Sequence, residues 1–322
     1  MLLTASITGS ILGPVPAAGA STTSEAQPFG RFGAPLDVDH YNSAAMQLAA
    51  NRASMRPAVA SALEVIARYP SANWYGSNTP EFVQTLVHNR VEDAAKDGAI
   101  AQLVVFNLPH RGCEGAAEPG PTTAAGYKVW FRGFLRGLGT RRAIVIVEPD
   151  ALALASCLSA RLRTERYGLI RWAVNRLERQ GSWAYIDIGH SKWLTLDQAA
   201  ARLQKSGIAD AAGFSLNESN FRPDGELLKY GRAISRRVGG RHFVIDSSRN
   251  GVAPKAADTA FCNPPHKGLG HAPTGRTGIA GLDAFLWIKN PGGSDGTCNG
   301  GPDAGHWYER YALMLVRNAH LT

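Results

Sequence analysis

Short apolar runs alternate with longer amphipathic stretches from about residue 44 to the C-terminal end of the chain. Several runs are continuous and rich in β-branched residues, which is typical of strands buried on both faces. The runs predicted as strands are 72–75, 102–106, 143–147, 183–186, 213–216, 242–245 and 284–288. The clearest helical stretches between and after them are 163–180, 195–206, 224–238 and 303–318. Thr195 is expected to cap the second of these helices.

Strand and helix alternate about seven times, which predicts an α/β fold with a parallel sheet and right-handed crossovers. No linker and no internal repeat divides the chain, so we expect a single domain over residues 39–322. Residues 1–20 are uncharged, apolar in their first half and end in small residues, which indicates a signal peptide that lacks the usual positive start. Residues 21–38 are expected to form a flexible N-terminal tail.

Most of the predicted strands are followed directly by a polar residue. These residues are Asn107, Glu148 and Asp150 around a proline, Asp187, Asn217, Asp246 and Lys289. In a parallel barrel, the carboxyl ends of the strands build the functional site. From spacing alone, each aspartate by itself is better explained by helix capping or a turn. The series of carboxylates and amides as a whole favours a polar site at that edge.

Composition and charge narrow the class of protein. Hydrophobic residues make up 44% of the 322 residues and charged residues 19%, as in a globular protein, and no apolar run is long enough to span a membrane. The net charge is +8, but no basic block is interleaved with aromatic residues, so we expect no nucleic-acid partner. The chain holds no phosphate-binding loop, no G-x-S-x-G and no H-E-x-x-H, so we expect neither a cofactor nor a metal. The four cysteines form no C-x-x-C pair, which favours two disulfides in an exported protein.

Seven strings carry a family resemblance. They are LVVFNLPHRGC (103–113), IVIVEPDAL (144–152), YIDIGHSKWL (185–194), GFSLNESNF (213–221), FVIDSSRNG (243–251), CNPPHKGLG (262–270) and LDAFLWIKNPGGSDGTC (282–298). In this order they resemble glycoside hydrolase family 6, the inverting β-1,4-glucanases once called cellulase family B. The resemblance runs from about residue 74 to residue 298.

The resemblance implies a distorted, TIM-barrel-like α/β barrel of seven parallel strands with a sugar-binding cleft along its top. It assigns Asp150 as the general acid, Asp295 as the candidate base or partner of a water chain, and Asp187 as a supporting carboxylate. The implied substrate contacts are Trp74, Phe106, Arg111, His190, Trp193, Asn217, Asn220, Phe261 and Lys289. The implied disulfides are Cys113–Cys157 and Cys262–Cys298, and the short enclosed loops suggest an open cleft and attack on internal bonds.

The chain departs from the family pattern close to the chemistry. Gly112 stands where the family has an aspartate that raises the pKa of the acid, and Phe106 stands where it has a tyrosine. Glu114 or Glu118 could supply the missing carboxylate from the same loop. Phe261 and Gly293 also replace a tryptophan and a glutamate, which weakens the assignment of the glycan.

Two hypotheses follow from these departures. In the first, the protein is a secreted, monomeric glycosidase that cleaves internal β-1,4 bonds of a polysaccharide or oligosaccharide, with β-glucan as the expected substrate. A different cell-envelope glycan is a variant of this hypothesis. In the second, the acid is present but its proton relay is broken, and the protein is a slow or inactive glycan-binding homologue. General acid–base assistance contributes about 10²- to 10⁴-fold, which sets the size of that loss.

Overall fold

The computed structural model describes residues 29–112, 120–253, 261–319 and 321. Within them, seven strands form one sheet whose spatial order follows the sequence, and every neighbouring pair is parallel. The strands are β1 (Asn73–Tyr75), β2 (Gln102–Val105), β3 (Ile144–Val147), β4 (Trp183–Asp187), β5 (Gly213–Leu216), β6 (His242–Asp246) and β7 (Leu282–Leu286). The predicted parallel α/β sheet is confirmed. The last strand begins two residues earlier than predicted, beside a register shift in its pairing with β6.

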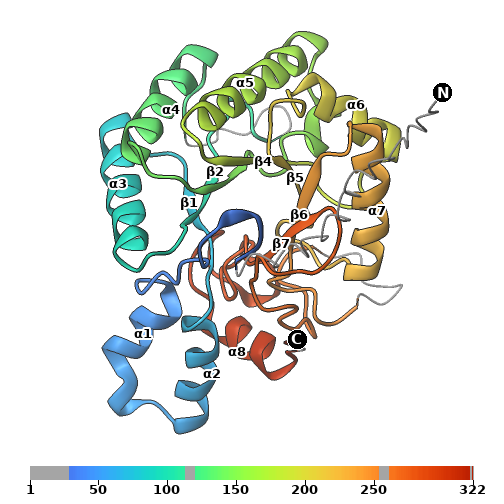
Figure 1. Ribbon diagram of the computed structural model, residues 1–322. Helices are drawn as coiled ribbons and strands as arrows, with labels where there is room; N and C mark the ends of the chain where they lie inside the picture. The colour runs from blue at the N-terminus through green and yellow to red at the C-terminus, as the bar shows by residue number, and fades with distance from the viewer. Residues whose placement is uncertain (1–28, 113–119, 254–260, 320, 322) are drawn as a thin grey trace, which may run out of the picture.

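The sheet curls into a distorted half-barrel with helices on its outside (Figure 1). Its two edges approach each other at β1 and β7. The backbone N–H of Ala72 donates to the carbonyl of Trp287 at 2.9 Å, and the indole N–H of Trp74 donates to the carbonyl of Ile288 at 2.8 Å. These bonds hold the first strand of the sheet close to the segment that follows the last strand.

Eight α-helices surround the sheet in the part of the chain that the structure describes. They are α1 (Ser43–Asn51), α2 (Pro57–Ala67), α3 (Pro80–Lys96), α4 (Ala124–Leu138), α5 (Ala160–Arg179), α6 (Leu196–Lys205), α7 (Asp224–Arg237) and α8 (Glu309–Arg317), with short 3₁₀ turns at Gly30–Phe32, Arg52–Ser54, Ala153–Cys157 and Cys298–Gly300. Thr195 caps α6 as predicted, because its hydroxyl accepts the N–H of Gln198. The final helix begins at Glu309 rather than residue 303. Its expected first turn is a loop instead, in which Gly305 donates its N–H to the Ser294 carbonyl.

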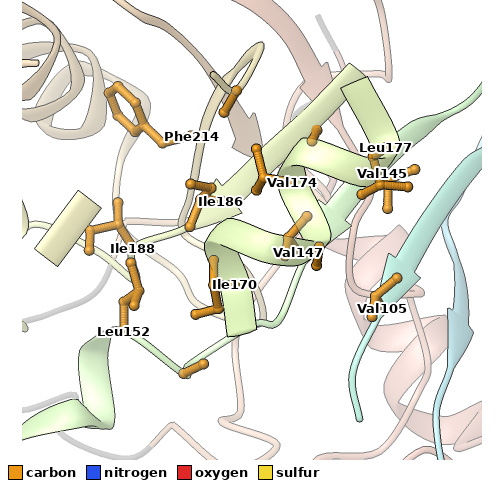
Figure 2. Packing of buried hydrophobic residues seen from close by; sticks show 14 of the residues in the cluster. Val105, Val145, Val147, Leu152, Ile170, Val174, Leu177, Ile186, Ile188 and Phe214 are labelled. Carbon is orange, nitrogen blue, oxygen red and sulfur yellow. The ribbon is translucent and has the colours of Figure 1, made fainter. Parts of the chain in front are cut away.

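The strands are buried on both faces, as their continuous apolar runs indicate, except for Asn73 and Trp74 of β1, which are partly exposed, and His242 at the start of β6, which is exposed. Alternate residues of β3 face different clusters: Val145 and Val147 pack under the outer helices, and Ile146 lies inside the barrel. Figure 2 shows α5 laying Ile170 and Val174 along the outer layer. Because both sides of the sheet are filled, close packing constrains the positions of the strand ends independently of the polar contacts there.

The N-terminal segment is packed from residue 29 onward, earlier than the predicted tail boundary at residue 38. The phenyl ring of Phe32 is buried against Trp183, and Leu36 pairs with Ile100 as an isolated bridge. Arg31 contacts Asp283 at 2.9 Å beside a cavity of about 570 Å³ at the amino edge of β6 and β7. Burial of an aromatic ring and an ion pair hold this segment in place. Residues 1–28, which include the predicted signal peptide, lie outside the described residues.

Helix α7 approaches β6 so closely that one helical position has no room for a side chain. A Cβ on Gly231 would lie 2.6 Å from the phenyl ring of Phe243, which is itself fully buried. Gly225, in the first turn of the same helix, has no atom within 4 Å of such a Cβ. The two glycines therefore differ in their packing, although they share one helix.

We predict that Gly231→Ala lowers the free energy of unfolding by about 1–3 kcal/mol, because an overpacked core must shift a buried ring. Gly225→Ala is the matched control and should leave stability unchanged or raise it by up to about 1 kcal/mol, since alanine favours helix. Urea unfolding followed by circular dichroism measures both variants. Equal midpoints for the two variants would contradict the close approach of α7 to β6.

Candidate active site

The carboxyl ends of β3 to β6 bring four acidic side chains together. Asp150 follows β3, Asp187 ends β4, Glu218 follows β5 and Asp246 ends β6. Asp187, Glu218 and Asp246 are each no more than 5% exposed, while Asp150 is partly exposed. Their spacing follows directly from the parallel order of the strands.

The backbone around Asp150 is held in an unusual conformation. Glu148 and Asp150 have φ angles of +53° and +65°, which non-glycine residues rarely adopt. Glu148 is fixed from below, because its buried carboxylate accepts the N–H groups of Asn107 at 2.9 Å and Leu108 at 3.1 Å. The N–H of Asp150 donates to Asp187 Oδ1 at 3.1 Å. Strain of this kind persists only where surrounding contacts enforce it, and it is concentrated at functional sites.

Burial raises the pKa values of Asp150 and Asp187 above those of ordinary aspartates. Burial is the main cause that raises the pKa of Asp150 to about 6; the charge of Lys289 lowers it and that of Asp295 raises it. Burial and the neighbouring Asp150 raise the pKa of Asp187 to about 7, although Asp187 accepts the N–H of Gly189 and the hydroxyl of Ser215, both at 3.1 Å. Both groups can therefore carry a proton in mildly acidic solution.

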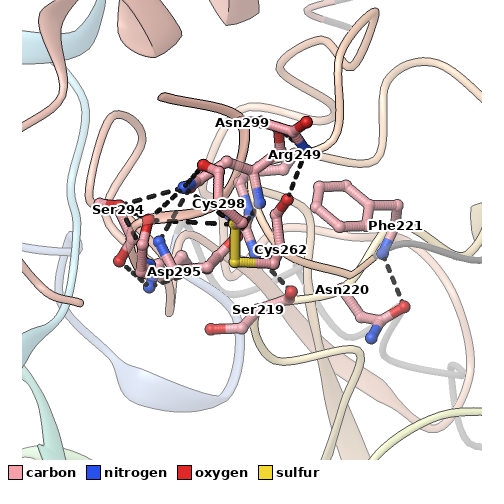
Figure 3. Close-up of polar contacts among 12 residues, drawn as sticks. Ser219, Asn220, Phe221, Arg249, Cys262, Ser294, Asp295, Cys298 and Asn299 are labelled. Atoms are coloured by element: carbon pink, nitrogen blue, oxygen red, sulfur yellow. Dashed lines mark hydrogen bonds and ion pairs between the residues drawn. A yellow bond between two sulfur atoms is a disulfide. The ribbon is translucent and has the colours of Figure 1, made fainter. Parts of the chain in front are cut away.

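Asp295 has the opposite electrostatic environment. Burial alone would raise its pKa, but Arg249 at 2.8 Å and Lys289 at 3.1 Å outweigh burial and hold the pKa below its usual range. The N–H of Asn263 adds a bond of 2.9 Å to Oδ2. Figure 3 shows the guanidinium of Arg249 between Asp295 and the loop that carries Ser219. Asp295 is therefore a fixed anion.

The role of Asp246 and Arg249 was not predicted from the sequence. The carboxylate of Asp246 accepts the N–H groups of Ser219 and Lys289, both at 3.1 Å, so it joins the loops after β5 and β7. The sequence indicates Asp246 only as a polar residue at a strand end, and it assigns no role to Arg249 within the string FVIDSSRNG. Complete burial of the Arg249 side chain has no signal in a single sequence.

Two groups of predicted substrate contacts lie beside the carboxylates. On one side, His190 and Trp193 have ring centroids 5.5 Å apart, and Trp193 is 38% exposed. Burial and the charge of Arg222 lower the pKa of His190 to about 4, so its imidazole is neutral near pH 7. Lys289 belongs to the same edge of the sheet and is bonded to Asp295.

On the other side, Trp74 and Phe106 pack edge to face with centroids 5.4 Å apart, and both are partly exposed. The guanidinium of Arg111 lies 4.5 Å over the Phe106 ring and donates to the Phe106 carbonyl at 2.5 Å. An aromatic pair with a neighbouring cation offers apolar and polar contacts together, which is typical of a binding surface for an uncharged polar ligand.

The remaining predicted residues are less directly connected to the carboxylates. Asn217 is fully buried and donates its amide to the Asp246 carbonyl at 2.8 Å, so it orders the loop rather than facing solvent. The Asn220 side chain accepts the Phe221 N–H at 3.1 Å. Phe261 is 68% exposed. Glu114 and Glu118, the predicted compensating carboxylates, lie outside the described residues.

The predicted disulfide Cys262–Cys298 is confirmed, with Cα atoms 6.1 Å apart. It lies beside Asn263 and Asp295 (Figure 3). Cys157 is also disulfide-bonded, whereas its predicted partner Cys113 lies outside the described residues. Across the described ranges, no group of three or more His, Cys, Asp or Glu residues could hold a metal ion. No described helix is both long and apolar enough to cross a membrane.

Comparison with known proteins agrees with this geometry. A family model described as glycosyl hydrolases family 6 matches residues 33–319. Endoglucanase A from Cellulomonas fimi is 40% identical over 259 residues, which are 80% of this chain and 56% of that protein. Endoglucanase A from Thermobispora bispora is 35% identical over 277 residues, which are 84% of this chain and 60% of that protein. The match thus spans less than two thirds of either relative.

A solved structure extends the likeness to three dimensions. The endoglucanase Cel6 from Mycobacterium tuberculosis, in complex with methyl-cellobiosyl-4-deoxy-4-thio-β-D-cellobioside, is 41% identical with a TM-score of 0.83. The alignment covers 89% of this chain and 97% of that one. Fold, carboxylate edge and these likenesses define the glycoside hydrolase class. Within that class, the chain belongs to glycosyl hydrolases family 6.

We predict that the double variant Cys262→Ala/Cys298→Ala loses up to about 4 kcal/mol of stability, because the disulfide closes a loop of 36 residues in the unfolded chain. Thermal unfolding measures the loss. Thiol titration of the unfolded, unreduced wild-type protein should find no free thiol, as both predicted disulfides require. Two reactive thiols in the wild type would contradict the predicted pairing.

Proposed function

We propose that this protein is a secreted glycoside hydrolase that cleaves internal β-1,4 bonds of a glucan, with Asp150 as the general acid. The observation that carries the proposal is the protonatable Asp150 beside the ionised Asp295 at the carboxyl edge of the sheet. Two relatives carry the name endoglucanase A, and the solved endoglucanase with 41% identity holds a thio-linked cello-oligosaccharide, which supports a β-1,4-glucan as substrate.

The acid step follows from the environment of Asp150. The leaving oxygen of a glycosidic bond needs a proton as the bond breaks, and a carboxyl group with a pKa near the working pH supplies it efficiently. Burial provides that pKa, and the hydrogen bond from its N–H to Asp187 fixes the backbone from which its side chain projects. Asp187 is the supporting carboxylate in this mechanism.

The second step needs a water molecule on the opposite face of the sugar ring. Asp295 is the candidate to orient that water, directly or through further water molecules. Its low pKa makes it a weak acceptor of a whole proton, but it stays ionised throughout the reaction because Arg249 and Lys289 are fixed beside it. An anion in this position also favours the positive charge that develops on the sugar in the transition state. We infer inversion of configuration from this arrangement.

The aromatic residues supply the remaining recognition. Trp193 with His190 would stack against a glucose unit on one side of the cleaved bond, and Trp74 with Phe106 on the other. Secretion is supported by the confirmed disulfide, since such bonds persist in oxidising compartments. A slow, glycan-binding protein is the second candidate, which Gly112 favours by providing no carboxylate at the position where the family has one.

We predict that Asp150→Asn lowers kcat/KM on soluble β-1,4-glucan by about 10²- to 10⁴-fold, since an amide cannot donate the proton. For the wild type, activity requires protonated Asp150. The value of kcat/KM should therefore be high below about pH 6 and fall at higher pH. Asp210→Asn, on the exposed turn before β5, is the control and should keep full activity. Reducing-sugar release from a panel of glucans and envelope glycans measures all three proteins. Glycan binding without turnover in every form would favour the second candidate.

We also predict that the first product has the α configuration, because the attacking water approaches from the face opposite the leaving group. Proton NMR of the anomeric region, recorded before mutarotation, distinguishes the two outcomes. A β-configured first product would mean a retaining mechanism and would exclude the role of Asp295 given above.

A further inference from the structure

The positive charge of the chain is concentrated in two neighbouring helices. Together, α4 and α5 contain nine Lys and Arg residues and two Glu residues, a net charge of +7 out of the +8 of the whole chain. Figure 1 shows these helices side by side on the outside of the sheet. Of the nine basic side chains only Arg166 is buried, so the outer surface of the two helices is strongly positive. We call this surface the α4–α5 face.

Trp172 of α5 lies at the centre of a group of cations on this face. The charged groups of Lys128, Arg132 and Arg176 are 5.8, 5.9 and 5.6 Å from the centroid of its indole ring. The ring is partly exposed and packs edge to face on Phe131 of α4, with centroids 5.5 Å apart. Residues of both helices thus gather three positive charges around one aromatic ring.

These three cations have no acidic partner. Among the described residues, no Asp or Glu forms an ion pair with Lys128, Arg132 or Arg176, whereas Arg141, just after α4, is paired with Glu92 at 2.8 Å. Like charges at this separation repel one another, and a cation–π contact at an exposed site is only a weak attraction. An anionic group bound at this point would relieve the repulsion among all three cations.

The helical turn before Trp172 leaves part of the indole uncovered. Gly168 is exposed, and a Cβ at this position would have no atom within 4 Å. Because side chains on a helix lean toward its N-terminus, the indole of Trp172 extends over the turn that contains Gly168. An uncovered indole surface is suited to packing against the apolar face of a sugar ring.

We propose that the α4–α5 face is a second binding surface, which takes an acidic polysaccharide. Carboxylates of the polymer pair with Lys128, Arg132 and Arg176, and one sugar ring packs on Trp172. The face lies on outer helices, whereas the four acidic side chains of the candidate active site lie at the carboxyl ends of the strands. The two sites can therefore be occupied at the same time.

The composition of the face favours a glycan over other polyanions. Among the described residues of α4 and α5, Val129 is the only exposed large hydrophobic side chain, too little for insertion into a lipid surface. Single-stranded nucleic acids are bound by a series of aromatic residues on which successive bases stack, and this face has one such ring. A polymer of charged sugars matches both the cations and the single ring.

The test compares polygalacturonate with its fully methyl-esterified form, which has the same chain without carboxylates. We expect the wild type to bind only the acidic form, and more weakly as salt is added, because salt screens exposed charges. In the triple variant Lys128→Gln/Arg132→Gln/Arg176→Gln, the dissociation constant at low salt should rise about tenfold, and its salt dependence should become shallower. Biolayer interferometry on the full chain measures both quantities. Equal binding of the esterified polymer would overturn the proposal.

The matched control removes the same charge from another part of the surface. Arg56→Gln/Arg310→Gln/Arg317→Gln changes residues at α2 and α8, which lie across the sheet from α5 (Figure 1). Its dissociation constant should stay within about threefold of the wild-type value, since screened charges act only over short distances. Equal losses in the two triple variants would overturn the proposal, because binding would then depend on net charge alone.

Two further measurements identify the occupant. Trp172→Leu keeps every charge and should weaken polygalacturonate binding about three- to tenfold with the salt dependence unchanged. Unchanged affinity in this variant would overturn the contact with a sugar ring. A single-stranded oligonucleotide or an anionic lipid vesicle that binds the wild type more tightly than polygalacturonate, with the same loss in the first triple variant, would overturn the assignment of a glycan. All these measurements are independent of the proposed hydrolytic activity.

Discussion

The carboxylate of Asp246 is the contact on which the arrangement of the site depends. It accepts N–H groups from the loops after β5, β6 and β7, and its own backbone carbonyl accepts the amide of Asn217. A carboxylate that accepts several backbone N–H groups can remain buried, because those dipoles replace the water it has lost. Three loops that are far apart in the sequence are thereby fixed relative to one another. The packed strands determine where the loops begin. The hydrogen bonds to Asp246 fix the backbone of the loops and so the positions from which their side chains project.

The acidic groups of the site fall into two sets, one with a lowered pKa and one with raised pKa values. Asp295 is neutralised by two cations, Arg249 and Lys289, so it remains ionised. For Asp150, Asp187 and Glu218, burial outweighs the compensating contacts and shifts the pKa values upward, so these groups hold protons instead. One edge of the sheet thus contains both a permanent anion and a store of protons, which are the two requirements of acid-assisted bond cleavage with an activated water.

The alternation of apolar runs and amphipathic stretches was sufficient to predict the parallel sheet, because strands buried on both faces have a distinctive composition. It placed the last strand and the last helix less well, since the pairing shift at β6 and the loop before Glu309 depend on contacts between distant segments. The polar strand ends indicated the edge at which Asp150 and Asp187 lie. Glu218 was within a recognised string, but burial and the identity of its neighbours are properties of the folded chain. Its place among the four acidic side chains at the carboxyl edge of the sheet could not be inferred from its position in the sequence.

Trp74 combines an observed structural contact with a proposed role in substrate binding. Its indole N–H closes the seam between the first and last strands, while its ring is a partly exposed surface on which a sugar could stack. Among the described residues, β1 and β7 are not paired as neighbouring strands, so this seam has fewer backbone bonds than any other interval of the sheet. The width of the barrel mouth is therefore coupled to the residue that we propose as a stacking surface for the glycan. A substitution of Trp74 that reshapes the proposed stacking surface, for instance for a bulkier glycan, would also remove the indole bond to the Ile288 carbonyl.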